Sequence, residues 1–515
     1  MKFAHKAMAV LLAGIVCFSF STFTSHATQT TEDATEAESE TTDASSLPIE
    51  SNEISGWPQG PVVSAESAIL MDAATGTILY SKNIDAREYP ASITKLMTVL
   101  LALENSSLDE TVVFSQNAVF SIERASSHIA RTTDEELTME QCLYAIMLES
   151  ANECANAVAE HIAGSVEAFA DMMNQRAAEL GCTNTHFVNP HGLHDPDHYT
   201  TAHDMALITR EVLTYDAFRE ISGTVSYNLP PTNKNDGTLT MYNHHSMICT
   251  NRTSQYYDAT VFAGKTGYTT DALNTLVTCA SRNGMELICV LMRSPSGTPY
   301  PDTASLLDYG TEHFHPEALP ERISELPQDV RQAAADAAPG YDLDTAEALP
   351  SEANCVILPD SVPFEALTPS VSVRESEDSS VLISVTYHYE TVSLGTAVYR
   401  AEPIQVQSAA VTGTDNLSEN TSRTSATRKP GSQQNILKYI LIGAIAVILL
   451  LLITLLTLFA VQTHQANTRR RKRRASQIKR NRRSSGSRGT RRTASRRLEH
   501  FDDPDLPEEF DDFNF

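Results

Sequence analysis

Three short motifs follow one another along this chain of 515 residues, and they restrict its possible folds more than any other feature. They are Ser92-Ile93-Thr94-Lys95, which fits S-x-x-K, Ser150-Ala151-Asn152, which fits S-x-N, and Lys265-Thr266-Gly267, which fits K-T-G. Any one of them alone is weak, because serine and lysine are common. All three in this order indicate one site that combines a nucleophile, groups that move its proton and a cationic strand for a substrate carboxylate. The fold must therefore bring three distant segments together.

The first motif supplies a nucleophile and its base. A serine hydroxyl reacts slowly unless a neighbouring group removes its proton. Ser92 and Lys95 are three positions apart at a predicted helix start, so their side chains lie on one face. Lys95 acts as a base only when it is neutral, and burial together with the charge of Lys265 would favour that state. The helix N-terminus would also place backbone N–H groups near a developing oxyanion.

The other two motifs supply proton transfer and substrate binding. Ser150 and Asn152 stand between two helical, apolar segments, where Ser150 can relay a proton and Asn152 can bind a substrate amide. On their own they would more often be capping residues. Lys265 and Thr266 can hold a carboxylate, and Gly267 allows a substrate to approach the strand backbone closely.

Hydrophobic periodicity predicts an α+β catalytic domain over residues 58–315. Ser67 to Asp72 has a strand pattern near its beginning, and 275–280 and 286–292 form a predicted hairpin around Asn283-Gly284 near its end. Residues 139–181 between them suit helices. Strands at both ends with helices in the middle indicate that the two ends share one sheet.

The remainder of the chain is predicted to contain several further segments. Before the domain, residues 1–27 have the charged start, apolar run and small residues of a signal peptide, and the acidic stretch 28–57 is expected to be disordered. After the domain we expect, in order, a Pro- and Ala-rich linker (316–350), a small β-rich domain (351–408), a flexible linker (409–435), a transmembrane helix (439–461) and a basic, then acidic, tail (462–515).

Net charge and cysteine content argue against a nucleic-acid-binding protein and against a fold held together by disulfides. The net charge is −27 even though 469–497 contains 15 Lys and Arg residues, so the rest of the chain is strongly acidic and no nucleic-acid partner is expected. The basic block is better explained as a cytoplasmic flank of the span, near anionic lipid. Without Cys17 of the signal peptide, seven cysteines remain. They are expected to be free, buried thiols, and hairpin register puts Cys279 and Cys289 on opposite faces.

Longer segments resemble a known family. Pro90 to Thr98, the segments 187–193 (FVNPHGL) and 199–206 (YTTAHDMA), and Gly264 to Thr269 are similar to the D-alanyl-D-alanine carboxypeptidases, which are low-molecular-mass penicillin-binding proteins of the S11 serine peptidase family. The resemblance covers about residues 60–310. It implies the serine β-lactamase/transpeptidase-like fold, an antiparallel sheet flanked by helices plus a helical lobe.

The resemblance also implies the reaction. Ser92 would be acylated as the terminal D-alanine of a peptidoglycan stem peptide leaves, with Lys95 as base. Ser150 and Asn152 would move protons and bind substrate, and Lys265 and Thr266 would hold its carboxylate. The backbone N–H groups of Ser92 and Tyr268 would bind the oxyanion before water releases the acyl group. No metal or cofactor is expected, and β-lactams would be covalent inhibitors.

Several alternatives stay open. A β-lactamase shares the motifs, but its second motif is usually Ser-Asp-Asn, and the 187–206 signature argues against it. A catalytically silent, membrane-anchored sensor of stem peptides or β-lactams is disfavoured by the intact Ser92, Lys95 and Lys265. His191 is interpreted as a turn residue rather than a base. The expected location is the cell membrane, with the catalytic domain outside and the tail in the cytoplasm.

Overall fold

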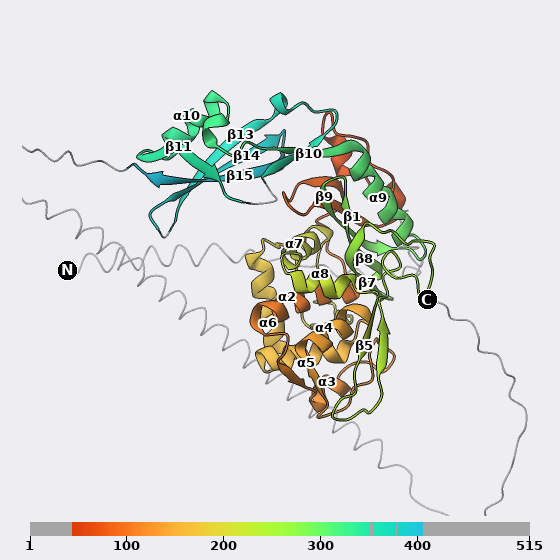
Figure 1. Ribbon diagram of the computed structural model, residues 1–515. Helices are drawn as coiled ribbons and strands as arrows, with labels where there is room; N and C mark the ends of the chain where they lie inside the picture. The colour runs from red at the N-terminus through yellow and green to blue at the C-terminus, as the bar shows by residue number, and fades with distance from the viewer. Residues whose placement is uncertain (1–43, 351–353, 377, 405–515) are drawn as a thin grey trace, which may run out of the picture. The chain divides into compact units, whose positions relative to one another are not determined.

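A five-stranded antiparallel sheet in the order β2-β1-β9-β8-β7 is the centre of the computed structural model, which describes residues 44–350, 354–376 and 378–404 (Figure 1). Its strands are β1 (Ser67–Asp72), β2 (Ile78–Lys82), β7 (Val261–Thr269), β8 (Leu273–Arg282) and β9 (Met285–Ser294). The strand order places β1 beside β9, so the beginning and the end of the predicted domain share one sheet. The predicted α+β class is confirmed.

The hairpin between β8 and β9 turns at Asn283 and Gly284, whose φ angles are 52° and 77°. Two consecutive positive φ angles are typical of the tight turn that Asn-Gly favours. The register places Cys289 opposite Thr278 rather than Cys279. The two thiols therefore point to opposite faces, as predicted, and both are free.

Helices cover both faces of this sheet, so strand β1 is buried along its whole length. Ile69 and Met71 point into a core shared with α7 (Ala202–Val212). Ala68 and Leu70 point into a second core that includes residues of α9 (Pro299–His313). Alternation along one strand thus divides the apolar residues between two layers.

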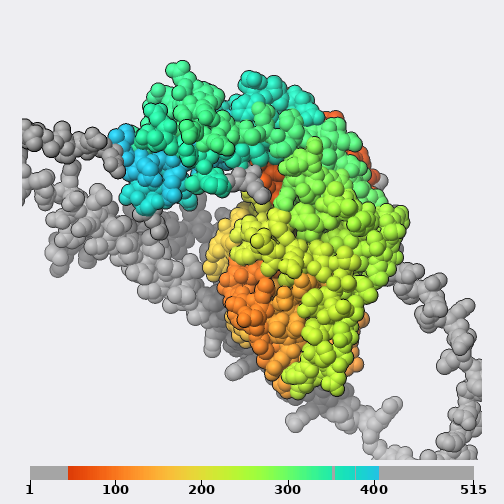
Figure 2. Space-filling view, viewed as in Figure 1, coloured from red at the N-terminus to blue at the C-terminus, as the bar shows by residue number. Residues whose placement is uncertain are grey.

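A helical lobe packs beside the sheet around helix α2 (Lys95–Asn105), whose residues from Lys95 to Ala102 are all buried. Helix α2 contacts α4, α5, α6 and α7. The other elements of this part are β3 (Thr111–Val113), α3 (Gln116–Phe120), β4 (Glu136–Thr138), α4 (Met139–Leu148), α5 (Asn152–Ala163), α6 (Val166–Glu179), α8 (Asp216–Gly223), β5 (Ser226–Leu229) and β6 (Leu239–Tyr242). Figure 2 shows orange residues of the lobe beside yellow-green residues from later in the chain. The Asn233 amide joins such segments by hydrogen bonds to the backbone of Asp134 and Glu136.

The end of the predicted acidic leader is ordered, which corrects the prediction for residues 44–57. A 3-10 turn (Glu50–Glu53) contacts β2, and Ser51 is buried. Trp57 is also buried; its indole N–H donates to the Leu79 carbonyl at 2.8 Å, and its ring lies 5.3 Å from that of Phe314. One large aromatic residue therefore anchors a segment whose composition alone suggests disorder.

Residues 316–350 are folded, so the prediction of a linker there is wrong. They contain the end of β10 (Phe314–Ala318), a short 3-10 turn (Ile323–Glu325), α10 (Gln328–Ala337) and β11 (Tyr341–Ala348). Val330 and Ala334, four positions apart, are buried on one face of α10, which contacts β13. The short side chains of this Ala-rich stretch form a packing face despite a composition typical of linkers.

The β-rich region consequently begins near residue 314 rather than 351. One sheet has the order β11-β15-β14-β13, and β10 pairs with β12. The remaining strands are β12 (Cys355–Pro359), β13 (Thr368–Glu375), β14 (Val381–Tyr389) and β15 (Val392–Pro403). Every described residue belongs to one compact unit.

The predicted signal peptide, the leader before residue 44 and everything after residue 404 lie outside the described residues. Within the described ranges, no helix combines the length and apolar character that crossing a membrane requires.

A buried carboxylic acid lies just before the first motif. Glu88 accepts a hydrogen bond from the Ser67 hydroxyl through one oxygen, while its other oxygen has no partner among the described residues. Its backbone pairs with Thr200 at 2.8 and 2.9 Å. Burial raises the pKa of Glu88 from 4.5 to about 7, helped by the charge of Glu66 and opposed by the Ser67 hydrogen bond and Arg293.

The raised pKa of Glu88 predicts that the stability of the fold depends on pH. The folded state favours protonated Glu88, so the group costs nothing below its ordinary pKa of 4.5 and destabilises the fold as pH rises through about 7. Glu88→Gln removes that dependence. Between pH 4 and pH 8 the free energy of unfolding of the variant should improve relative to wild type by roughly 3 kcal/mol. Denaturant titrations at several pH values measure it, with exposed Glu220→Gln as control; an unchanged difference between variant and wild type would contradict the prediction.

Candidate active site

The nucleophile segment is a short 3-10 turn, Ala91–Thr94, that runs directly into α2. Ala91 has φ +49°, a conformation that non-glycine residues rarely adopt. Ser92 follows it, and Lys95 is the first residue of α2. Lys95 Nζ lies 3.1 Å from Ser92 Oγ, so the two side chains meet as their spacing predicts.

Lys95 is fully buried among three oxygen atoms. Its Nζ lies 2.7 Å from Asn152 Oδ1, 2.6 Å from the His191 carbonyl oxygen and 3.1 Å from Ser92 Oγ. Burial lowers the pKa of Lys95 well below its usual value, and the charge of Lys265 lowers it further. A neutral amine has two N–H bonds and one lone pair. The two carbonyl oxygens can accept both N–H bonds, which leaves the lone pair for the Ser92 hydroxyl.

The segment 189–193 supports this arrangement through its backbone. The carbonyl of Pro190 accepts a 2.6 Å hydrogen bond from Thr98 Oγ1, and that of His191 accepts one from Lys95. Gly192 has φ +84°, and a Cβ there would lie 1.8 Å from the Ala91 carbonyl oxygen. This turn therefore fits against the strained nucleophile turn, and only glycine fits at its tightest point.

His191 is a turn residue, as interpreted from the sequence, and its imidazole bonds within the turn. Its Nδ1 accepts a 3.2 Å hydrogen bond from the Leu193 backbone N–H. Burial lowers the pKa of His191 well below its usual value, with a smaller effect from Lys95. The sequence did not reveal the importance of the His191 carbonyl, because a backbone group leaves no mark in the residue type.

The second motif lies at the junction of α4 and α5. Asn152 begins α5, and its backbone N–H donates to the Ser127 carbonyl at 3.0 Å while its side chain contacts Lys95. Ser150 has φ +58° and is buried. Its hydroxyl has no hydrogen-bond partner among the described residues, so it does not bond to Ser92 or Lys95. The structure thus brings Asn152 to Lys95 directly and leaves Ser150 with unused hydrogen-bonding capacity.

The third motif lies on strand β7. Lys265 is fully buried and donates to the Thr266 carbonyl at 2.9 Å. Burial lowers the pKa of Lys265 to about 7, and the charge of Glu149 opposes this shift. A Cβ on Gly267 would lie 2.8 Å from the Ser92 backbone nitrogen and 2.3 Å from Thr275 Oγ1. Glycine therefore lets β7 approach the amide of the nucleophile.

Two further residues at the site, Glu149 and Glu153, were not predicted. The Glu149 carboxylate lies 3.0 Å from His244 Nε2, and its charge raises the pKa of Lys265 against the effect of burial. Glu153 accepts a 2.7 Å hydrogen bond from the Ile129 N–H, and its charge raises the pKa of Lys95 against the effect of burial. Two glutamates that flank Ser-Ala-Asn in an otherwise apolar helical context were the available signal.

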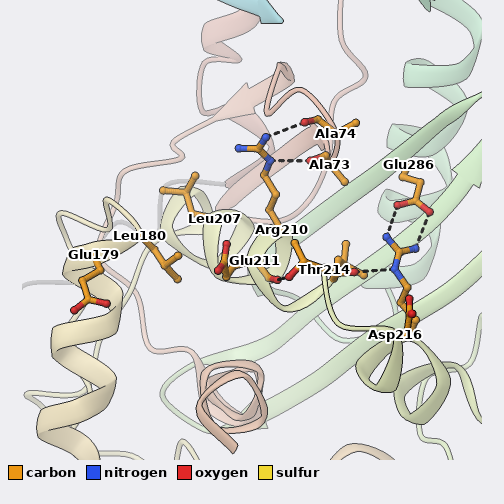
Figure 3. Close-up of a pocket in the computed structure, with 12 residues that line it drawn as sticks. Ala73, Ala74, Glu179, Leu180, Leu207, Arg210, Glu211, Thr214, Asp216 and Glu286 are labelled. Atoms are coloured by element: carbon orange, nitrogen blue, oxygen red, sulfur yellow. Dashed lines mark hydrogen bonds and ion pairs between the residues drawn. The ribbon is translucent and has the colours of Figure 1, made fainter. Parts of the chain in front are cut away.

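A cavity of about 800 Å³ lies elsewhere, between the β1–β2 turn and helices α6, α7 and α8 (Figure 3). Arg210 donates to the carbonyls of Ala73 and Ala74 at 2.7 and 2.8 Å, and Arg219 makes two 2.7 Å bonds to Glu286. Both guanidinium groups thus connect helices to the sheet or its turn by hydrogen bonds. None of the described residues that line this cavity belongs to the three motifs.

Comparisons with known proteins support the family resemblance. The sequence model of peptidase family S11, D-alanyl-D-alanine carboxypeptidase, matches residues 56–296. D-alanyl-D-alanine carboxypeptidase DacB2 of Mycobacterium tuberculosis (strain ATCC 25618 / H37Rv) is 30% identical over 280 residues, which are 53% of this chain and 88% of DacB2. The chain belongs to peptidase family S11.

Other members of family S11 match less of their own length. D-alanyl-D-alanine carboxypeptidase DacF of Bacillus subtilis (strain 168) is 35% identical over 266 residues, 50% of this chain and 65% of DacF. DacA of Haemophilus influenzae is 30% identical over 264 residues, 49% of this chain and 63% of DacA. The match therefore spans slightly less than two thirds of these relatives.

The fold agrees with a solved structure of penicillin binding protein 5 from Haemophilus influenzae. The TM-score is 0.53 at 24% identity, and the match covers 67% of this chain and 98% of that one. The matched part of the chain is longer than residues 56–296, which the family model matches. The similarity of fold therefore extends into the β-rich region.

Proposed function

We propose that the protein is a serine-type D-alanyl-D-alanine carboxypeptidase that removes the terminal D-alanine from peptidoglycan stem peptides. The observation that carries this proposal is the position of Lys95 Nζ, buried 3.1 Å from Ser92 Oγ and between two carbonyl oxygens. Membership of family S11 and the curated relatives support the substrate class.

Acylation begins with proton transfer. Neutral Lys95 accepts the Ser92 proton while Ser92 Oγ bonds to the carbonyl carbon between the two D-alanines. The lysine that results is an ammonium group with three N–H donors, which matches its three oxygen neighbours. The N–H groups of Ser92 and Tyr268 stabilise the oxyanion, and Gly267 permits the necessary approach of β7.

The leaving group and the substrate carboxylate use the other motifs. Lys265 and Thr266 bind the terminal carboxylate. Ser150, whose buried hydroxyl has no partner among the described residues, gives its proton to the nitrogen of the departing D-alanine and takes up the proton that Lys95 accepted from Ser92, which returns Lys95 to the neutral amine. Water then attacks the acyl-enzyme with Lys95 as base, which releases the shortened peptide and restores the Ser92 hydroxyl.

Two measurements on one preparation separate this function from its alternatives. We expect release of D-alanine from a tripeptide that ends in D-Ala-D-Ala, and stable labelling by a penicillin with slow turnover. Fast penicillin hydrolysis without D-alanine release would indicate a β-lactamase. Penicillin labelling without D-alanine release and without penicillin hydrolysis would indicate a sensor.

We also propose a membrane location with the catalytic domain outside the cell. The support comes from the sequence of residues 1–27, from the uncharged stretch 439–461 and from the basic block that follows it. Peptidoglycan, the proposed substrate, lies on that side of the membrane. A role in cell-wall remodelling and cell shape follows from this placement.

Protease accessibility tests the topology. Protease added to intact cells without a wall should remove residues 60–408 and spare an epitope placed after Phe515. Detergent should expose that epitope, which controls for its intrinsic sensitivity. Loss of the epitope in intact cells, or its recovery in a soluble fraction, would overturn the proposed orientation or the span.

A further inference from the structure

The geometry of β7 fixes the direction in which a substrate lies along it. Lys265 and Thr266 bind the terminal carboxylate in the proposed function, on which this inference rests. Gly267, the next residue, approaches the Ser92 amide, where the scissile carbonyl reacts. The substrate residues that precede the scissile bond must therefore lie further along β7, toward Tyr268 and the turn that joins β7 to β8.

That turn carries an exposed charge. The side chain of Asp271 is 50% exposed, and its Oδ2 lies 3.8 Å from His194 Nδ1. The His194 ring is 4.5 Å from that of Tyr89, in an edge-to-face arrangement. His194 thus lies between Asp271 and Tyr89, a residue two positions before the nucleophile segment begins at Ala91.

The backbone of this turn is fixed in place. Arg293 donates to the Asp271 carbonyl at 2.9 Å and also pairs with Glu66 at 2.6 Å. The Arg293 guanidinium is therefore engaged by a carboxylate and a carbonyl. By contrast, the 3.8 Å separation of Asp271 and His194 is too long for a good hydrogen bond, and the half-exposed Asp271 carboxylate can accept one from another donor.

Distances along an extended chain connect this carboxylate to one substrate residue. Each extended residue advances about 3.4 Å, so the residue before the D-Ala-D-Ala pair lies roughly 7 Å beyond the terminal one. Counted from Thr266, that distance corresponds to two positions and places the residue beside Tyr268, one position before β7 ends at Thr269. A lysine-type side chain from this position can extend several ångströms toward Asp271, and its ammonium group is the natural partner of a carboxylate.

We propose that Asp271, with His194 beside it, recognises the free side-chain amine of a diamino residue that precedes D-Ala-D-Ala. The preferred substrate is then a stem peptide whose amine is still unacylated, and the enzyme acts on stems that have not been cross-linked through it.

The test compares two tripeptides, Nα-acetyl-L-lysyl-D-alanyl-D-alanine with a free ε-amine and the same peptide with that amine acetylated. Full-length wild type should show about a 5-fold higher kcat/KM for the free amine, a size typical of a partly exposed charge pair. Asp271→Asn should remove the preference, and Asp271→Glu should keep most of it. Asp85→Asn is the matched control, because Asp85 forms a comparable exposed pair with His203 at 3.3 Å.

A second readout separates this inference from the proposed function. Each peptide also competes with a fluorescent penicillin for Ser92, which measures peptide binding even if D-alanine is never released. A free-amine preference in competition that Asp271→Asn abolishes supports the inference, with or without peptide hydrolysis. Equal competition by both peptides, or a preference that survives Asp271→Asn, overturns it. D-alanine release without such a preference would keep the function and discard the subsite.

Discussion

Ser92→Ala should abolish penicillin labelling and reduce D-alanine release by at least about 10³-fold, the largest functional effect we expect from any single substitution. Alanine removes the only atom of Ser92 that can form the acyl bond. Lys95 keeps both carbonyl partners, the Asn152 amide and the His191 backbone, so the fold should lose little stability.

The measurement is fluorescent penicillin labelling of the purified protein followed by identification of the modified peptide, with D-alanine release assayed in parallel. Exposed Ser305→Ala on α9 is the control and should behave as wild type. Labelling that persists in Ser92→Ala, for instance at Ser150, would show that the nucleophile is assigned to the wrong residue.

Gly192→Ala should damage both stability and activity. The new Cβ would lie 1.8 Å from the Ala91 carbonyl oxygen, a distance that forces a backbone shift. Any such shift moves the turn before Ser92 and also the His191 carbonyl that holds Lys95. Because displacements near 1 Å can reduce catalysis about 100-fold, we expect at least that loss in kcat/KM for D-alanine release.

Gly164→Ala is a matched control for this variant. Gly164 has φ +81°, close to the +84° of Gly192, but a Cβ there would have no neighbour within 4 Å. Both variants carry the cost of a left-handed alanine, about 1–2 kcal/mol, whereas Gly192→Ala adds an overpacking cost of about 1–3 kcal/mol. Thermal melts and D-alanine release measure both effects. Equal behaviour of the two variants would show that the contact with Ala91 is unimportant.

Local sequence patterns predicted the elements whose geometry depends on nearby residues. The three-residue spacing of Ser92 and Lys95 predicted their contact, and Asn283-Gly284 predicted the β8–β9 hairpin with its register. Alternating and apolar runs at both ends of the domain predicted a shared sheet. For the Ser92–Lys95 contact and the hairpin, the physical cause lies within a few residues of the pattern. The pairing of β1 with β9 joins distant segments, and it was inferred from the order of strands and helices along the domain.

Interactions that depend on distant backbone groups could not be predicted in this way. The His191 carbonyl approaches Lys95 only because the 189–193 turn packs against the nucleophile turn. Composition was also misleading at two places. The stretch 316–350 folds because Val330 and Ala334 meet a sheet formed by later residues, and the end of the acidic leader is ordered because Trp57 has a partner 257 positions later, at Phe314. The catalytic roles of the motif residues stay predictions.

The buried position of Trp57 has a practical consequence. The chain contains one tryptophan, so its fluorescence reports a single location without any engineered label. That indole donates to the Leu79 carbonyl and lies against the ring of Phe314, the first residue of β10. Its emission should therefore move to longer wavelength as soon as the segment before β1 separates from this junction. Time-resolved emission would follow that local opening independently of catalysis.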